Sequence, residues 1–283
     1  MIAGASGLLG RFMASRLEVS GWLVFPFPHA NLDISNPEEV RASFAESQPQ
    51  LVINCAATAD VDRCERDPKW ARAVNEEGPR LLAQQCNKYE ADLVHISTDY
   101  VFDGVKAGLY TQEDETNPLS VYAQTKLGGE IAVRDEARRF YIIRSSWIFG
   151  PGGKNFGSRV IQLAREGAHI RAVTDQTSIP TYVHDLAARI EELINLGAHG
   201  LYHVTNTGPT SWFDFAKLAL DLAQLGDTLI EPVKREALRQ IAPRPNNTPM
   251  RCLVSENLGL RRLRHWREAL EEFVREYEMK AAG

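Results

Sequence analysis

Short apolar runs alternate with longer amphipathic stretches along the chain through residue 204. Runs of a few Val, Ile and Leu residues are typical of buried parallel strands, and apolar residues at helical spacing indicate helices packed on a sheet. The predicted strands are 22–25, 51–53, 93–97, 141–144 and 201–204, and the predicted helices are 11–19, 79–87, 120–138 and 181–196. This alternation predicts an α/β fold with a doubly wound parallel sheet of the Rossmann type.

A glycine-rich loop stands between the apolar start of the chain and the first predicted helix. Gly4, Gly7 and Gly10 form GxxGxxG, a variant of the Rossmann fingerprint. Gly4 would make the tight turn, Gly7 would let the backbone approach a pyrophosphate, and Gly10 would allow close helix packing. Backbone N–H groups at the start of helix 11–19 would face the phosphates. Only residues 1–3 precede the loop, so we expect either an unusually short strand or a few residues upstream of Met1.

The residues after the second predicted strand indicate which dinucleotide binds. NAD sites usually place an acid there to hold the ribose diol, but residues 26–29 read PFPH. Arg11, directly after the third glycine, could instead meet a 2′-phosphate. This favours NADPH, with NADH still possible.

The pattern changes after the glycine-rich stretch 150–153, and this change predicts two domains. Residues 1–148 would form the NADP-binding domain, and residues 181–205 would return to it. Residues 149–180 and 206–283 would form a smaller substrate-binding lobe. In that lobe, 156–166, 212–225 and 266–279 are predicted helices, and 170–173 is a predicted strand.

Three side chains supply the groups that reduction of a carbonyl requires. Hydride addition to a carbonyl leaves an alkoxide, which must receive a proton. Tyr122 and Lys126 lie four residues apart, on one face of helix 120–138, and an ammonium close to a phenol lowers its pKa from about 10. Asn54 and Thr98 follow predicted strands, so they would converge where parallel sheets bind ligands. A Tyr–Lys pair is also common on solvated helix faces, so the assignment depends on the other motifs.

Composition narrows the classes of function. Hydrophobic residues make up 44% of the chain and charged residues 24%, as in soluble globular proteins. With a net charge of −5, the chain lacks the excess of basic residues that is typical of nucleic-acid-binding proteins. We also see no membrane span or signal peptide in the sequence. The four cysteines show no metal-ligand spacing. We therefore expect a cytoplasmic protein that binds neither nucleic acid nor membrane.

Motifs in a fixed order carry a family resemblance. VINCAA (52–57) and VDRCE (61–65) come first, then STDYVFDG (97–104), YAQTK (122–126) and RSSWIFG (144–150). NF (155–156), DQTSIPT (175–181) and RP (244–245) follow. Together they resemble the dTDP-4-dehydrorhamnose reductases, members of the extended short-chain dehydrogenase/reductases. The resemblance runs over nearly the whole chain.

The resemblance implies a reaction in nucleotide-sugar and cell-surface polysaccharide biosynthesis. NADPH would reduce the 4-keto group of dTDP-4-dehydro-L-rhamnose to give dTDP-L-rhamnose. Tyr122 would donate the proton, Lys126 would lower the pKa of Tyr122 and hold the nicotinamide ribose, and Thr98 would bind the carbonyl oxygen.

The resemblance also implies two sets of binding residues. Those for the cofactor are Gly4, Ser6, Gly7, Leu8, Leu9, Gly10, Arg11, Asp33, Ile34, Asn54, Cys55, Ala56 and Ala57, together with Tyr122 and Lys126. Those for the substrate are Asp99, Tyr100, Val101, Trp147, Asn155 and Arg244. An arginine suits a diphosphate through bidentate hydrogen bonds. Trp147 could equally belong to the core, and Arg244 to a solvated loop.

Departures from the family pattern leave three properties open. Ser178 stands where the pattern has glycine, and Thr58-Ala59 where it often has Tyr-Thr. Some members bind Mg²⁺ at a dimer contact through a Glu whose place is taken here by Phe12. The exact sugar nucleotide, the Mg²⁺ dependence and the choice between monomer and homodimer are therefore undecided.

Two other classes of protein share these motifs. One is an NADP-binding regulatory subunit resembling the methionine adenosyltransferase β subunit, which keeps a similar Thr, Tyr and Lys set. The other comprises sugar-nucleotide epimerases, dehydratases and reductases of other keto sugars. A dehydratase needs an acid where this chain has Tyr100. The DQ…PT and SW matches favour the reductase.

Overall fold

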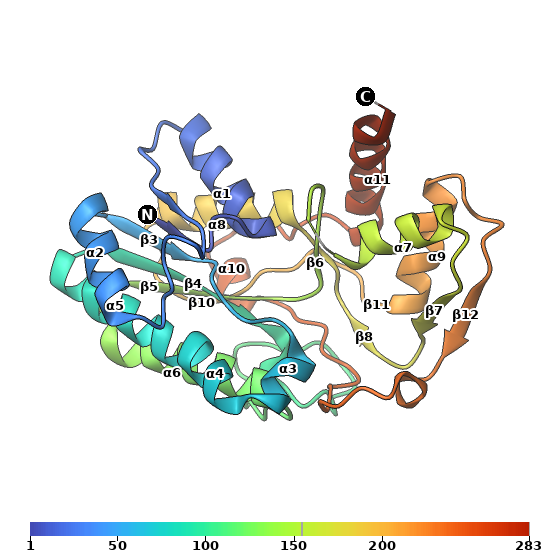
Figure 1. The fold of residues 1–283 in the computed structure, drawn as a ribbon, viewed down its shortest axis with the longest axis horizontal. Helices are drawn as coiled ribbons and strands as arrows, with labels where there is room; N and C mark the ends of the chain where they lie inside the picture. The colour runs from blue at the N-terminus through green and yellow to red at the C-terminus, as the bar shows by residue number, and fades with distance from the viewer. Residues whose placement is uncertain (154, 283) are drawn as a thin grey trace.

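The computed structural model describes residues 1–153 and 155–282, built around a six-stranded sheet (Figure 1). Its strands are β1 (Ile2–Ala3), β2 (Pro26–Phe27), β3 (Leu51–Asn54), β4 (Asp92–Thr98), β5 (Phe140–Ser145) and β10 (Gly200–His203). They lie in the order β10-β5-β4-β3-β1-β2, and every neighbouring pair is parallel. The predicted Rossmann-type α/β fold is confirmed.

Helices cover both faces of this sheet (Figure 1). One face carries α1 (Leu8–Val19) and α8 (Val183–Leu196), and the other carries α2 (Pro37–Ser47), α5 (Gly78–Tyr89) and α6 (Val121–Glu136). Strand side chains alternate between the two cores: Ile53 and Val94 pack with α1 and α8, whereas Val52 and Leu93 pack with α2 and α5. Burial on both faces explains why the strands read as continuous apolar runs.

Short elements join the strands at the edge of the sheet where the site lies. These are α3 (Val61–Arg66), α4 (Pro68–Arg72), the π-helical turn η1 (Ala73–Glu77) and the 3-10 turn η2 (Asp99–Val101). The turn η2 follows β4 directly, so the residues after Thr98 leave the sheet at once. Two more short elements, η3 (Arg235–Leu238) and α10 (Leu253–Asn257), lie late in the chain.

The remaining elements form a second lobe with its own core (Figure 1). The helices are α7 (Phe156–Arg165), α9 (Trp212–Leu222) and α11 (Trp266–Ala282). The strand pairs are β7 (Ile170–Val173) with β12 (Ile230–Val233), β8 (Thr177–Ser178) with β11 (Thr210–Ser211), and β6 (Ile148–Phe149) with β9 (Thr181–Tyr182). β10 lies in the main sheet beside β5. The domain boundaries drawn from the sequence stay a prediction.

Two predicted elements lie at other residues than the sequence pattern indicated. The second strand is not 22–25 but β2, at Pro26–Phe27. Proline has no N–H, and β2 is the edge strand, where that loss is tolerated. The segment beginning at Thr181 first pairs as β9, and its helix starts at Val183. β1 has two residues, as short as the loop position suggests.

A buried ion pair fixes α6 against the sheet. Glu130 on α6 is fully buried, and its carboxylate accepts two hydrogen bonds from Arg144 of β5, at 2.8 and 2.7 Å. The hydroxyl of Ser97, on β4, donates to the same carboxylate. Because Glu130 lies one turn beyond Lys126, this contact sets the position of the predicted catalytic helix.

Glu130→Gln should strongly destabilise the protein, because it leaves the Arg144 guanidinium buried without a counter-charge. We expect the free energy of unfolding to fall by about 3–5 kcal/mol. Glu38→Gln breaks the exposed pair with Arg41 on α2 and should cost less than about 0.5 kcal/mol. Urea denaturation of the three proteins compares them. Equal, small losses would show that the buried pair does not hold α6.

Candidate active site

The fold brings the hydroxyls of Thr98 and Tyr122 together. Thr98 ends β4, and Tyr122 lies in the first turn of α6, which begins after its N-cap Ser120. The Thr98 hydroxyl lies close enough to the Tyr122 phenol to act on the pKa of that phenol. The Thr98 oxygen also accepts from the backbone N–H of Tyr100 at 3.2 Å, and its hydroxyl donates to the Asp99 carboxylate. Two of the three predicted catalytic groups therefore meet at the carboxyl edge of the sheet.

The electrostatics of this pair differ from the sequence-based expectation. Burial raises the pKa of Tyr122 above its usual value of 10, and the Thr98 hydrogen bond only partly opposes this. The Lys126 ammonium donates instead to the backbone carbonyl of Ile96, at 2.6 Å. Burial lowers the pKa of Lys126 to about 8, against the charges of Glu130 and Cys55. In the protein alone, the phenol is thus protonated at neutral pH and is not acidified by Lys126.

The glycine-rich loop has the backbone geometry that a dinucleotide requires. Gly4 has φ +73°, and a Cβ there would lie 2.6 Å from the backbone nitrogen of Ala56. A Cβ on Gly10 would lie 2.3 Å from the Gly4 carbonyl oxygen. The N-cap Gly7 offers no side-chain cap to α1, so N–H groups of the first turn are open to a phosphate. The contact between Gly4 and Ala56 lies at the switch point between β1 and β3, where such sheets bind ligands.

Other residues predicted to bind the cofactor stand around this loop. The exposed Arg11 donates to the carbonyls of Gly7 and Gly152, and within the described residues it has no carboxylate partner. The Asn54 amide oxygen accepts from the Ala56 N–H at 3.1 Å, which holds the turn after β3. The Asp33 carboxylate accepts from Ser35 in a local turn, and Ile34 is buried in the core. Their contacts with a cofactor stay predictions.

A chain of aromatic and amide groups leads from the phenol into the second lobe. The ring of Tyr100 packs edge-on against Tyr122, with centroids 5.9 Å apart. Gln176 donates to the Tyr100 hydroxyl at 2.9 Å and accepts from the Trp212 indole at 3.2 Å. Trp212 stacks on Trp147, with centroids 3.6 Å apart. Together these side chains form a wall beside the catalytic hydroxyls.

Trp147 has two features typical of a functional position. Its φ of +45° is uncommon for a bulky residue, and such strain gathers at binding sites. Its indole nitrogen is buried and, within the described residues, makes no hydrogen bond. A buried donor without a partner is costly, so a ligand atom that accepted from it would be favoured.

Two guanidinium groups lie near the Tyr100 hydroxyl. Arg244 pairs with Asp62 of α3 at 3.0 Å, and Arg235 donates to the Arg244 carbonyl. Both positive charges act to lower the pKa of Tyr100, although burial raises it to about 12. The sequence reasoning missed Arg235, Gln176 and Trp212 as site residues. Only Gln176 lay in a noted motif, and no local pattern marked the other two.

Three residues predicted to bind substrate have other uses in the structure. Asn155 is the N-cap of α7, and its side chain bonds Gly150, Gly153 and Ser158. Val101 is fully buried in an apolar cluster with Phe102 and Met250. The buried Asp99 carboxylate accepts hydrogen bonds from protein hydroxyls. These contacts favour structural or positioning roles over direct contact with substrate.

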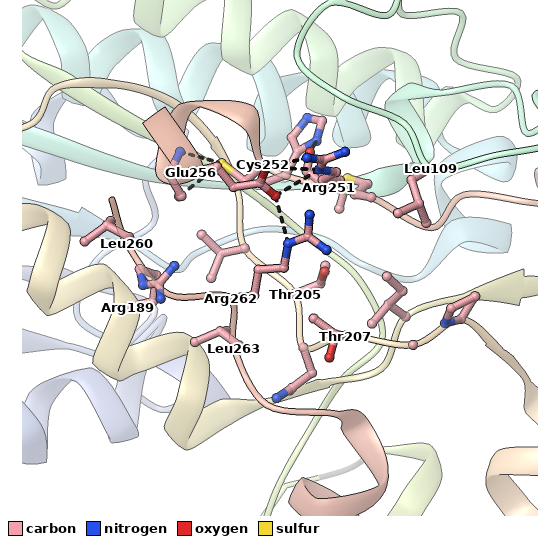
Figure 2. Close-up of a pocket in the computed structure, with 18 residues that line it drawn as sticks. Leu109, Arg189, Thr205, Thr207, Arg251, Cys252, Glu256, Leu260, Arg262 and Leu263 are labelled. Carbon is pink, nitrogen blue, oxygen red and sulfur yellow. Dashed lines mark hydrogen bonds and ion pairs between the residues drawn. The ribbon is translucent and has the colours of Figure 1, made fainter. Parts of the chain in front are cut away.

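A separate pocket is lined by residues of α10 and of the segments around it (Figure 2). At its rim the Glu256 carboxylate bonds Arg251 at 2.6 Å and Arg262 at 2.9 Å. Leu260 and Leu263 line another side. Thr98, Tyr122 and Lys126 are not part of its lining.

The described residues hold neither a membrane-spanning helix nor a cluster of metal-ligating side chains. Within 1–153 and 155–282, no helix is both long and apolar enough to cross a membrane. Over the same residues, no cluster of His, Cys, Asp and Glu side chains is arranged to hold a metal ion.

Comparison with known proteins identifies the family. Residues 1–279 match the family model described as the RmlD substrate binding domain. The dTDP-4-dehydrorhamnose reductase of Streptomyces griseus is 38% identical over 278 residues, covering 96% of this chain and 91% of that relative. The chain belongs to the dTDP-4-dehydrorhamnose reductase family.

Two further known proteins resemble the chain closely. A probable dTDP-4,6-dihydroxy-2-methyloxan-3-one 4-ketoreductase of Streptomyces antibioticus is 38% identical over 274 residues, with 96% and 93% of the two chains covered. The crystal structure of dTDP-4-dehydrorhamnose reductase from Bacillus anthracis, in complex with NADP, superposes with a TM-score of 0.94. It is 35% identical, with 97% and 98% of the two chains covered.

Gly10→Ala should weaken dinucleotide binding and destabilise the protein, because the new methyl group would strike the Gly4 carbonyl and displace the loop. We expect a loss of about 1–3 kcal/mol in unfolding free energy and a weaker Kd for NADPH by fluorescence titration. Gly108→Ala is the matched control, since a Cβ there meets nothing within 4 Å. If Gly10→Ala bound NADPH as the control does, the loop would not be the phosphate site.

Proposed function

We propose that this protein is an NADPH-dependent reductase of the 4-keto group of dTDP-4-dehydro-L-rhamnose, with dTDP-L-rhamnose as product. The observation that carries the proposal is that the Thr98 and Tyr122 hydroxyls lie together at the edge of the sheet that also carries the glycine-rich loop. Relatives at 38% identity, named as reductases acting on dTDP-linked compounds, support it. Because their named substrates differ, another dTDP-linked 4-keto sugar is the nearest alternative.

In the reaction, the protein's side chains protonate the carbonyl oxygen and stabilise the negative charge that forms on it. When bound, the dinucleotide supplies the hydride that reduces the carbonyl carbon. Tyr122 gives its proton to the oxygen, and the raised pKa keeps that proton on the phenol at neutral pH until charge develops. Thr98, whose hydroxyl donates to Asp99 in the protein alone, would turn that hydroxyl to the same oxygen and stabilise the charge as it forms.

Lys126 completes the set through its position and charge. Its ammonium lies one helical turn beyond Tyr122 and is held by the Ile96 carbonyl. With a pKa of about 8, it is mostly protonated at neutral pH. That positive charge would stabilise the phenolate that remains after proton transfer.

The choice of NADPH depends on the ends of β1 and β2. Residues after β2 are Pro28 and His29, and the first acid, Asp33, is engaged with Ser35. No acid is thereby placed to hold a ribose diol at the strand end. Arg11 is exposed beside the glycine loop, and its guanidinium could exchange backbone carbonyls for a 2′-phosphate.

Substrate would lie between the two lobes at the aromatic wall. Tyr100 and Trp147 would face the sugar, and the unpartnered indole N–H of Trp147 would find an acceptor there. Arg244 and Arg235 would bind the diphosphate, because guanidinium groups pair with phosphate oxygens through two hydrogen bonds.

Tyr122→Phe should abolish most of the turnover without loss of cofactor affinity. Removing the proton donor should lower kcat by about 10²–10⁴-fold, while the glycine loop still binds NADPH. The assay follows NADPH oxidation with dTDP-4-dehydro-L-rhamnose, with Tyr89→Phe as control. Normal turnover by Tyr122→Phe would remove Tyr122 as donor, and no turnover by the unmodified protein would reject the proposed function.

Arg11→Ala should weaken NADPH more than NADH, because only NADPH carries the 2′-phosphate that Arg11 would bind. Because the substitution removes a charge-assisted hydrogen bond at a partly exposed site, we expect the affinity for NADPH to fall about tenfold and the affinity for NADH to change little. Kd values from titration with both cofactors measure this. Arg165→Ala, an exposed substitution on α7, is the control. Equal losses for both cofactors would refute the role of Arg11.

A further inference from the structure

One buried carboxylate joins the catalytic hydroxyl to the second lobe. Asp99 is 2% exposed. Its Oδ1 accepts from Thr98 at 3.2 Å, and its Oδ2 accepts from Ser178 at 2.9 Å and from Thr248. Thr98 belongs to β4, whereas Ser178, in β8, and Thr248 lie outside the six-stranded sheet. The carboxylate therefore connects Thr98 with two segments that lie outside the six-stranded sheet.

Backbone hydrogen bonds join these two segments into one unit. The N–H of Thr177 donates to the Asn246 carbonyl at 2.7 Å, and the N–H of Thr248 donates back to the Thr177 carbonyl at 2.9 Å. The same unit meets the loop after β4 a second time, because a Cβ on Gly104 would lie 2.7 Å from the Asn246 nitrogen. We call β8 together with residues 246–248 the docking unit.

An ionised carboxylate suits this place because it only accepts hydrogen bonds and has room for several donors. Hydrogen bonds to a charged acceptor are also stronger than those between neutral groups. Within the described residues, no cation pairs with Asp99, so the three hydroxyls are its partners. Burial raises the pKa of Asp99 to about 6, which leaves the carboxyl mostly ionised at neutral pH.

The docking unit is flanked by two buried residues that line a pocket. Ile179, next to Ser178, and Met250, two residues beyond Thr248, line the pocket of Figure 2. Gln176, two residues before Ser178, bonds the hydroxyl of Tyr100. The docking unit is therefore also connected to the aromatic wall, through Gln176 and Tyr100.

We propose that Asp99 is a positioning residue that seats the docking unit on β4 and holds the Thr98 side chain in place beside Tyr122. The two hydroxyls of the docking unit set how the second lobe meets the sugar nucleotide. The bond to Thr98 sets how that side chain meets the reacting carbonyl. This inference rests on the proposed reductase function.

The experiment separates the two sides of the carboxylate. Ser178→Ala and Thr248→Val each remove one bond to the docking unit and keep the bond to Thr98. Each should raise the KM for the keto-sugar nucleotide by about tenfold, the value of one hydrogen bond to a charged group, and should leave kcat within about twofold. Thr174→Val removes a hydroxyl of the same lobe whose one hydrogen bond within the described residues is to the Val233 carbonyl, and it should change neither constant.

Asp99→Asn should change both constants, because one of the two carboxylate oxygens becomes an amide nitrogen, which donates and cannot accept from a hydroxyl. We expect KM to rise at least as much as in the single hydroxyl variants and kcat to fall by about tenfold. The Kd for NADPH should stay the same in every variant, since the glycine loop lies elsewhere. Adding Ser178→Ala to Asp99→Asn should raise KM no further, because the two substitutions break one interaction.

The outcomes distinguish this inference from the proposed function. If the unmodified protein binds NADPH but turns over no keto-sugar nucleotide, the proposed function fails. If it turns over substrate and Asp99→Asn keeps its KM and kcat, the positioning role is overturned. A common fall in Tm, kcat and NADPH affinity would show a merely structural role and would also overturn it. If Asp99→Asn does not fold, the two hydroxyl variants decide. An unchanged KM in both Ser178→Ala and Thr248→Val would also overturn the positioning role.

Discussion

The ion pair between Glu130 and Arg144 is the constraint on which the site depends. It is buried, and it ties α6 to β5 one turn beyond Lys126. A charge removed from water must find its partner at close range, so α6 has little freedom to slide along the sheet. Tyr122 is thereby held at the end of β4, where Thr98 meets it. The catalytic geometry follows from a contact that no substrate touches.

Much of the fold could be predicted because buried parallel strands appear in the sequence as short apolar runs. β3, β4 and β5 were found within a few residues of their bounds. β2 was misplaced because composition favoured residues 22–25, whereas the register with β1 selects Pro26–Phe27. β9 could not be seen, since its two residues pair only with β6, far back in the chain. Such pairings are tertiary and leave no local pattern.

The site divides in the same way. Spacing alone joined Tyr122 to Lys126, and the strand end indicated Thr98, because these relations are local. Gln176, Trp212 and Arg235 became visible only when the second lobe was in place. Asn155 and Asp99 carried motif signals that the structure explains by capping and by hydroxyl contacts. The pKa of Tyr122 was misjudged because burial, which the sequence does not report, outweighs neighbouring charge.

The central claim is that hydride passes to the carbonyl carbon of a dTDP-linked 4-keto sugar in the crevice between the lobes. The most direct measurement is nuclear magnetic resonance of the product formed with NADPH deuterated at the transferable position. The account predicts deuterium at C4 of the sugar, on one face only, with one NADP⁺ formed for each sugar reduced. Product without deuterium at C4, or cofactor oxidation without a reduced sugar, would contradict it.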